Sequence, residues 1–481
     1  MLVISIQGNF EEAKETIRFA SKMSEAIEFR LDLLEKNDLS HISKLKTLCK
    51  VPVIFTLRKK SHGGDFVGNE REREEKLLEL LSLKPDYVDL EYDCDFSDKI
   101  NPEVKVISSY HNFKETPEDL DGILKEMKGI PAAIYKVATM AQSSLDALKM
   151  LLFIKRHNNV AGMCMGQVGA ITRILAPIVN SSLTYSFLGR ETAPGQISLS
   201  ELIDIYHYPF LNRLTEIYGL IGDPVDKSIG HFCHNQIFKK LKKNAVYVKI
   251  PLKPLEVPEF FTLIRHLSFS GFSVTMPLKE VVGAHLSAID PQAKKIGAIN
   301  TLINRGGEWF GMNTDGDGAL DALEKKGKVA HKTLLIIGAG GAAKAIATEA
   351  SNRGARVIIA NRTLKKAKII ASQIKGGVIP IDQIDSCPYD IIINTTTVGM
   401  SPKIEEMAIP QEMIKENVLG FDVIMHPKET KFLNCVQNKG GKVVFGYEMY
   451  AQQALRQLKA FSINGFNEDE ILTLIESFCF I

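Results

Sequence analysis

Apolar residues recur in short runs along the first 200 positions of the chain, and polar segments with helical spacing separate most of these runs. Apolar runs of this length, bounded by turn residues, are typical of buried strands. Eight strands that alternate with helices indicate a (β/α)8 barrel, so we predict an N-terminal TIM barrel over residues 1–210. The eight predicted strands are 2–6, 26–31, 53–57, 87–90, 104–108, 132–137, 160–165 and 183–188.

A second α/β block begins at Glu216, after the short connecting segment YPFLNRLTE. Its first strand candidates are EIYGLIGDP, AVYVKIP, GFSVTMP and AINTLIN, with helical segments between them. From Lys332 the pattern becomes strand, glycine turn, helix and strand, in the segment KTLLIIGAGGAAKAIATEASNRGARVIIANRT. This order is typical of a dinucleotide-binding Rossmann domain.

Length and composition narrow the class of protein. A chain of 481 residues suggests two or three domains. The formal net charge of +2 gives no reason to expect a nucleic-acid partner, and no apolar run is long enough to span a membrane. The seven cysteines include no CxxC pair, and the chain opens as a strand rather than as a signal peptide. We therefore expect a reduced, cytoplasmic location.

Two local clusters, one of charged residues and one of metal-ligating residue types, could be taken for functional sites, and we expect neither to be one. The charge run EREREEK at 70–76 reads as a solvent-exposed helix face. The segment HFCH at 231–234 has metal-ligating residue types, but further ligands at suitable spacing are missing, so we expect no metal site.

Charged side chains gather at the C-terminal ends of the predicted barrel strands, where barrel enzymes carry their active sites. Taken alone, Lys136 in PAAIYKVATM reads as a lysine whose stem is buried and whose head reaches water. Taken alone, His111 reads as a structural histidine. At one barrel mouth they indicate a polar pocket instead, in which burial keeps an amine neutral and able to attack a carbonyl. The strand-end residues are Glu28, Arg30, Arg58, Asp89, Glu91, His111, Lys136, Met163 and Met165.

One reaction class uses this combination of residues well. An amine forms an imine with a ketone, and a histidine then removes the adjacent proton. Arginines hold a carboxylate with paired hydrogen bonds. The residues thus predict a small keto acid as substrate, with elimination or aldol cleavage as the reaction.

The segments EFRLD, FTLR, VDLE, SYHNFKETP, YKVAT and APGQIS resemble type I 3-dehydroquinate dehydratase across about the first 210 residues. The resemblance implies that Lys136 is the Schiff-base lysine and His111 the general acid/base. The family usually has a glutamate that supports this histidine where the chain has His62, and Asp65 is a candidate substitute. The implied substrate-binding positions are Glu28, Arg30, Arg58, Arg173, which would take the carboxylate, Thr192, where serine is common, and Gln196.

The second block has a phosphate-binding signature. In GAGGAA, the glycines Gly338, Gly340 and Gly341 follow a strand and open a helix, so a pyrophosphate can approach the backbone at a helix N-terminus. A GxG alone is usually a simple turn, but the strand–turn–helix–strand context favours a dinucleotide site. The next strand ends in Asn361, Arg362 and Thr363 rather than in an acid. Because Arg362 can contact a 2′-phosphate, we predict NADP as the cofactor.

Lys279 in VTMPLKE and Asp315 in NTDG would each be an ordinary surface or turn residue. Together with GDPVDKS, IGAINTL and INTTTVGM they resemble shikimate dehydrogenase from about Glu216 onward. The resemblance implies that Lys279 and Asp315 are the catalytic pair. It also implies a substrate-binding domain over 216–313, a Rossmann NADP-binding domain over 314–450, and C-terminal helices over 451–481 that return to the substrate domain. The implied substrate-binding residues are Ser228, Thr275, Asn300 and Gln453.

Three positions differ from the usual dehydrogenase pattern: Gly230, where an SxS motif has its second serine, Ser273, where NVT has asparagine, and Met425, where tyrosine is common. An S-x-G arrangement resembles relatives that accept quinate, so we consider quinate a candidate secondary substrate.

The sequence thus predicts a bifunctional enzyme. Its barrel would convert 3-dehydroquinate to 3-dehydroshikimate, and its second half would reduce 3-dehydroshikimate to shikimate with NADPH. A metabolite sensor built from the same domains is the alternative, which the presence of both pairs of catalytic residues disfavours. The sequence leaves the oligomeric state open.

Overall fold

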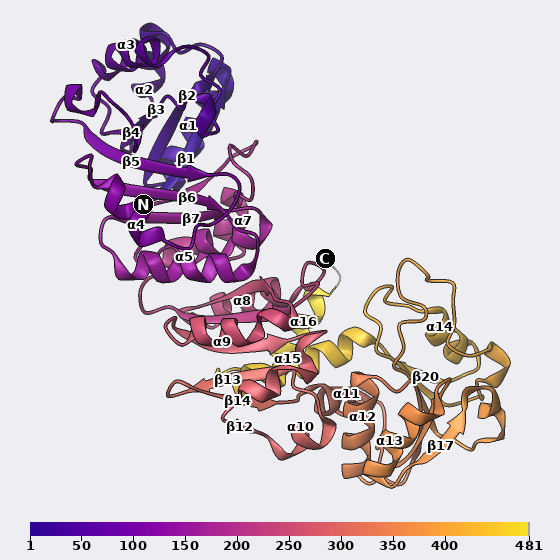
Figure 1. Cartoon of the computed structure of the whole chain (residues 1–481). Helices are drawn as coiled ribbons and strands as arrows, with labels where there is room; N and C mark the ends of the chain where they lie inside the picture. The colour runs from indigo at the N-terminus through magenta and orange to yellow at the C-terminus, as the bar shows by residue number, and fades with distance from the viewer. Residues whose placement is uncertain (480–481) are drawn as a thin grey trace. The chain divides into compact units, whose positions relative to one another are not determined.

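A computed structural model describes residues 1–479 of the chain (Figure 1). The chain divides into two compact units. The first comprises residues 1–217 and 242–268, and the second comprises residues 218–241 and 269–481. Within the described residues no helix is long and apolar enough to cross a membrane, and no group of three metal-ligating side chains is present.

The first unit contains the predicted barrel. Eight parallel strands pair in the order β7-β6-β5-β4-β3-β2-β1-β8, which nearly closes the sheet. All eight predicted strands are therefore confirmed, with small differences in their ends. The strands are β1 (Leu2–Gly8), β2 (Ala26–Leu34), β3 (Val53–Thr56), β4 (Tyr87–Glu91), β5 (Lys105–Asn112), β6 (Ile134–Met140), β7 (Val160–Met165) and β8 (Thr184–Ser186).

Alternation along each strand decides which side chains enter the barrel. Ile134 and Ala138 of β6 belong to an apolar cluster inside the barrel. Lys136 lies between them on the same side of the strand, so it also points inward. The helices that cover the barrel are α1 (Phe10–Met23), α2 (Leu39–Lys46), α3 (Glu70–Leu81), α4 (Leu120–Met127), α5 (Ser144–Arg156), α6 (Ile171–Ile174) and α7 (Leu199–Asp204). The first unit also includes β10 (Ala245–Pro251) and α9 (Val257–Ile264).

The prediction of a solvent-exposed helix face at 70–76 is wrong for Arg73. This side chain is fully buried, forms an ion pair with Glu91 at 2.8 Å, and donates to the carbonyl oxygen of Leu57 at 3.1 Å. Glu70, on the same helix, is its second carboxylate partner. A buried guanidinium is tolerated when carboxylates and carbonyls accept hydrogen bonds from its donors. One of these carboxylates, Glu70, lies on α3 itself.

In the second unit, the strands β9-β11-β13-β14-β12 run in that order within one mixed sheet. Strand β11 pairs antiparallel with β13, and β13 pairs antiparallel with β14. This sheet and its helices correspond to the predicted substrate-binding region. The elements are β9 (Glu216–Gly222), α8 (Gly230–Lys240), β11 (Phe269–Val274), β12 (Ala288–Ile289), α10 (Pro291–Ile296), β13 (Thr301–Arg305) and β14 (Glu308–Met312).

The Rossmann part of the second unit is a parallel sheet in the order β17-β16-β15-β18-β19-β20. Leu334 and Ile336 of β15 enter one apolar cluster, whereas Leu335 and Ile337 enter another, so helices cover both faces. Helix α15 (Gly446–Ala460) extends through position 450, where we predicted a boundary. The strands are β15 (Thr333–Ile337), β16 (Arg356–Asn361), β17 (Gly377–Pro380), β18 (Ile391–Asn394), β19 (Leu419–Asp422) and β20 (Lys442–Val444). The other helices are α11 (Asp315–Glu324), α12 (Gly341–Asn352), α13 (Leu364–Ile374), α14 (Lys431–Asn438) and α16 (Glu468–Phe478).

Candidate active sites

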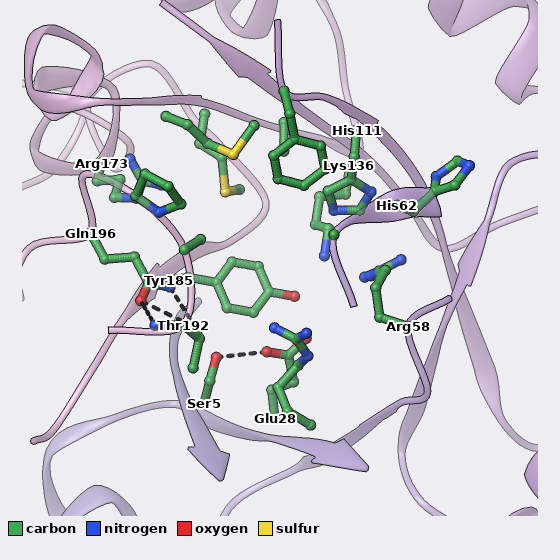
Figure 2. A pocket seen from close by; sticks show the side chains of 18 residues that line it. Ser5, Glu28, Arg58, His62, His111, Lys136, Arg173, Tyr185, Thr192 and Gln196 are labelled. Carbon is green, nitrogen blue, oxygen red and sulfur yellow. Dashed lines mark hydrogen bonds between the residues drawn. The ribbon is translucent and has the colours of Figure 1, made fainter. Parts of the chain in front are cut away.

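A pocket with about 680 Å3 of empty space lies at the C-terminal ends of the barrel strands. It brings together all eight barrel residues to which we assigned a role. Figure 2, which labels all of them except Arg30, shows Lys136 and His111 at one end of the cavity and Arg173 at the other. The eight residues are Glu28, Arg30, Arg58, His111, Lys136, Arg173, Thr192 and Gln196.

Lys136 is 4% exposed, and its Nζ atom lies 2.5 Å from Oδ2 of Asp89. Burial lowers the pKa of this lysine from its usual value, whereas the charge of Asp89 opposes that shift. Burial alone would raise the pKa of Asp89, but Arg58 and Lys136 hold it at about 2. Burial therefore makes the amine easier to deprotonate than a free lysine, while Asp89 partners its charged form.

Arg58 connects this ion pair to the rest of the pocket. Its guanidinium lies 2.8 Å from Asp89 and donates to the Ser109 hydroxyl, which itself donates to Asp89. Glu28, on β2, accepts hydrogen bonds from Thr56 at 2.8 Å and from Ser5 at 2.6 Å. The charged groups at this end are thus fixed by buried partners, which positions them before any substrate arrives.

The imidazole of His111 lies between two rings at the lysine end of the pocket. His62 is nearly perpendicular to it, with ring centroids 6.3 Å apart, and Phe113 is nearly parallel at 6.2 Å. Burial, followed by the positive charges of Arg58 and Lys136, holds the pKa of His111 well below its usual value. The ring is therefore neutral near pH 7, which is the form that can accept a proton.

The carboxylate near His111 is Asp93, which lies next to His62, the ring neighbour of His111. His62 lies beside that ring, and its Nε2 atom is 3.7 Å from Oδ2 of Asp93. Asp65, our candidate substitute, is exposed and does not line the pocket. Burial lowers the pKa of His62, so His62 is also neutral near pH 7.

The other end of the pocket suits an anion. Arg173 is 1% exposed, and its Nη1 atom donates to the carbonyl oxygen of Cys164 at 2.6 Å. Among the described residues, its buried Nε atom has no hydrogen-bond partner. Desolvation lowers its pKa to about 10, so the side chain stays charged. A buried guanidinium that lacks a carboxylate is a ready site for one from a ligand.

Thr192 and Gln196 lie on the loop after β8, near Arg173 (Figure 2). Gln196 Nε2 donates to the Thr192 hydroxyl at 3.0 Å, and the Thr192 amide donates to Gln196 at 2.8 Å. These bonds fix the loop so that both side chains line the cavity.

Sequence reasoning did not identify Ser5 and Tyr185 as pocket residues. Both lie on strands whose other apolar residues made them look like ordinary strand positions. Strand β1 pairs with both β2 and β8, with Ser5 opposite Glu28 and Tyr185 opposite Val3. With the correct strand register, the alternation of inward-facing residues could have identified these two residues, because Val3, Ser5 and Glu28 then all face the barrel interior.

In the second unit, Lys279 and Asp315 form an ion pair with Nζ 2.6 Å from Oδ2. Asn300 donates to the other oxygen of Asp315 at 2.7 Å and to Gln453 at 3.3 Å. These four predicted residues come from four separate segments, which the second unit brings into one cluster. Asp315 is the first residue of α11, where a carboxylate is favoured by the helix dipole.

The other predicted dehydrogenase residues lie on neighbouring loops. Thr275 follows β11, and its amide donates to the carbonyl oxygen of Ile221 on β9. Ser228 lies in the loop after β9, and its hydroxyl accepts from the amide of Gly230 at 3.1 Å. Ser273, at one of the unusual positions, donates to Gln457 at 3.0 Å rather than facing outward.

The glycine turn has the space that a dinucleotide requires. Gly338 has φ +111°, and a Cβ atom there would lie 2.5 Å from the Thr395 hydroxyl. A Cβ atom on Gly340 or Gly341 would meet nothing within 4 Å, so the start of α12 is open. The residues thus fit a phosphate at this helix N-terminus.

Asn361, Arg362 and Thr363 lie directly at the end of β16, on the same edge of the sheet as the glycine turn. The Asn361 side chain donates to the carbonyl oxygen of Thr363 at 2.9 Å, which holds the turn. Arg362 is exposed there and is available to a ligand.

Three family descriptions match successive parts of the chain. Type I 3-dehydroquinase matches residues 3–213, the shikimate dehydrogenase substrate-binding domain matches 220–302, and shikimate/quinate 5-dehydrogenase matches 321–429. A solved shikimate dehydrogenase in complex with NADP+ aligns with a TM-score of 0.53 at 34% identity, covering 56% of this chain and 96% of that chain. A shikimate 5-dehydrogenase from Thermus thermophilus, in complex with NADP(H) and shikimate, aligns with a TM-score of 0.52 at 28% identity, covering 55% and 100%.

Whole-length relatives contain both halves. The "Bifunctional 3-dehydroquinate dehydratase/shikimate dehydrogenase, chloroplastic" of Arabidopsis thaliana is 35% identical over 93% of this chain and 79% of its own length. The "Shikimate biosynthesis protein AroDE" of Chlamydia pneumoniae is 36% identical over 95% of this chain and 94% of its own length. Because these matches run through the barrel and the second unit together, the chain belongs to the family of bifunctional 3-dehydroquinate dehydratase/shikimate dehydrogenases.

Proposed function

We propose that the barrel pocket dehydrates 3-dehydroquinate to 3-dehydroshikimate and that the second unit reduces 3-dehydroshikimate to shikimate. The observation that carries the first step is the burial of Lys136 beside Asp89 and His111, in a pocket that ends at the guanidinium of Arg173. An amine, a neutral base and an anion site in one cavity match the carbonyl, the acidic proton and the carboxylate of this substrate.

In the barrel, the amine of Lys136 attacks the C3 carbonyl carbon, and the carbonyl oxygen leaves as water. A lysine ammonium and a ketone thus become an iminium ion and water, with no net change in protons. His111 then removes a proton from C2, and the electron pair moves toward the iminium nitrogen. The C1 hydroxyl leaves as water when His111 returns the proton to it. Hydrolysis of the remaining iminium ion releases 3-dehydroshikimate and restores Lys136.

Arg173 holds the substrate carboxylate at the far end of the pocket, because its positive charge is buried and its Nε donor has no hydrogen-bond partner among the described residues. Glu28, Arg30 and Arg58 face the ring hydroxyls at the lysine end. Thr192 and Gln196 contact the substrate near its carboxylate. This arrangement fixes the ring so that C3 meets Lys136 and C2 meets His111.

In the second unit, NADPH supplies a hydride when it is bound. Gly338, Gly340 and Gly341 leave room for its phosphates, and Asn361, Arg362 and Thr363 hold the adenosine end. Lys279 holds a proton at the carbonyl oxygen of 3-dehydroshikimate, and Asp315 keeps that ammonium oriented. Asn300 fixes the second carboxylate oxygen of Asp315, so the pair cannot rotate freely. Ser228, Thr275 and Gln453 bind the substrate.

The first product is the second substrate, and both steps can be followed in one cuvette. With 3-dehydroquinate and NADPH, the purified chain should oxidise NADPH and form shikimate in equal amounts. A protein that binds both compounds without consuming either would be the metabolite sensor instead.

We also place the enzyme in the cytoplasm, since all seven cysteines are free.

A further inference from the structure

Tyr185 occupies an unexpected place for a phenol. It lies on β8, is 4% exposed, and lines the barrel pocket. The Nζ atom of Lys136 lies over its ring, 4.8 Å from the ring centroid. The ring therefore packs against the amine that carries the proposed first step, and this packing needs no hydroxyl group.

The hydroxyl oxygen of Tyr185 is buried and has no hydrogen-bond partner among residues 1–479. Burial, followed by the negative charges of Glu28 and Asp89, raises the pKa of this phenol well above its usual value. The group is therefore a neutral donor across the working pH range. Buried hydroxyl groups are nearly always hydrogen-bonded, so an unpaired one in a pocket points to a partner on a ligand.

The direction of the hydroxyl indicates which part of the ligand it meets. In Figure 2 it points toward the end of the pocket with Lys136, Arg58 and Glu28, and away from Arg173 and Gln196. The carboxylates at that end already have their own donors. Asp89 accepts from Lys136 and Ser109, and Glu28 accepts from Ser5 and Thr56.

We propose that the hydroxyl of Tyr185 donates a hydrogen bond to the substrate oxygen on the carbon that Lys136 attacks. This inference rests on the proposed imine at Lys136. As the nitrogen–carbon bond forms, the π electrons of the carbonyl move onto its oxygen. A proton then passes from the attacking nitrogen to this oxygen, which becomes the hydroxyl of the addition product. The hydrogen bond stabilises this growing negative charge, and Tyr185 keeps its proton throughout. The hydroxyl then takes up the proton that the Lys136 ammonium released before the attack, which His111 holds in the meantime, and leaves as water, so the overall step is the one described above.

Tyr185→Phe tests the proposal, because it removes the hydroxyl and keeps the ring that packs on Lys136. Rapid-quench borohydride trapping in the pre-steady state, with 3-dehydroquinate in saturating amounts, measures the rate of imine formation. We expect the variant to form the adduct on Lys136 about tenfold to a hundredfold more slowly, the range for one hydrogen bond to a developing charge. Its melting temperature and its shikimate oxidation should equal those of the wild type.

Tyr135→Phe is the matched control. Tyr135 precedes Lys136 on β6 and does not line the pocket, and its hydroxyl donates to the carbonyl oxygen of Ile130. It should form the adduct at the wild-type rate. A normal trapping rate in Tyr185→Phe would overturn the inference, even if KM rose, because the hydroxyl would then contact another oxygen. A wild-type protein that forms no adduct on Lys136 would instead refute the proposed imine, and this inference with it.

Discussion

The Nζ atom of Lys136 lies 2.5 Å from Oδ2 of Asp89, and both groups are buried inside the barrel. Asp89 is also the carboxylate that partners Arg58, at 2.8 Å. One acid thus pairs with two buried cations, and burial is the larger influence on the pKa of Lys136. The charge of Asp89 determines how far that pKa falls, and this relationship leads to a pH prediction.

Asp89→Asn should move the pH profile of imine formation to lower pH. The carboxylate favours the ammonium form of Lys136, so its removal lowers the lysine pKa further, and the free amine becomes available at lower pH. Borohydride trapping across a pH series measures this directly. An unchanged profile, or a shift to higher pH, would show that Asp89 does not control the protonation of Lys136.

Asp89→Asn should also reduce the free energy of unfolding. Arg58 loses its nearest carboxylate, and breaking a buried ion pair on one side costs about 3–5 kcal/mol. Chemical denaturation followed by hydrogen exchange of barrel peptides, which separates the barrel from the second unit, gives the comparison with wild type. A loss below about 1 kcal/mol would mean that Glu91, 3.5 Å away, replaces Asp89 fully.

Lys136→Ala should abolish dehydration and leave shikimate oxidation close to the wild-type rate, because the two pockets lie in separate units. Wild-type protein treated with 3-dehydroquinate and borohydride should carry its adduct on Lys136, as peptide mass spectrometry would locate. The imine role is refuted if the adduct lies elsewhere, or if the variant dehydrates faster than about a thousandth of the wild-type rate.

His111→Ala should slow dehydration by roughly a hundred- to ten-thousand-fold, the usual loss when a general acid/base is removed. The imine should still form, since Lys136 is intact, so trapped adduct with little turnover is the expected pair of results. His62→Ala is the comparison variant, because His62 neighbours His111 and pairs with Asp93. Near-normal turnover in His111→Ala, with loss in His62→Ala, would assign the base to His62.

Arg362→Ala should weaken NADP binding and leave NAD binding nearly unchanged. The side chain is exposed at the end of β16, where a 2′-phosphate would offer it a charged partner. Titration calorimetry with both dinucleotides provides the measurement. Equal losses for the two would indicate that Arg362 stacks on adenine without contacting the phosphate.

Gly230→Ser should strengthen shikimate binding about tenfold to a hundredfold, because a serine adds one hydrogen bond to the carboxylate, worth about 1.5–3 kcal/mol. The Gly230 amide already donates to Ser228, so the new hydroxyl would lie beside that residue. The wild type should oxidise quinate measurably, since glycine leaves space near C1. Comparing kcat/KM for shikimate and quinate tests both statements. Absence of quinate oxidation together with no gain on shikimate would refute them.

The order of the elements could be predicted from the amino-acid sequence, and so could the candidate catalytic residues that the structure brings together. Short apolar runs mark each barrel strand locally, and Lys136 stands within one of them. Strand and helix periodicities depend only on residues that are close in sequence, so they can be recognised without knowing the fold. The glycine turn before α12 is local in the same way.

Contacts between distant segments were decided by the tertiary structure alone. Arg73 looked like a surface residue of a charged helix, but β4 brings Glu91 beneath it and buries both. Asp65 was the candidate carboxylate near His111, but Asp93 lies beside its neighbour His62, because the loops after β3 and β4 come together. Tyr185 faces Lys136 only because β8 closes against β1. Each of these contacts depends on strand register and on how the loops close. Register and loop closure result from many weak long-range interactions, which a local sequence pattern does not contain.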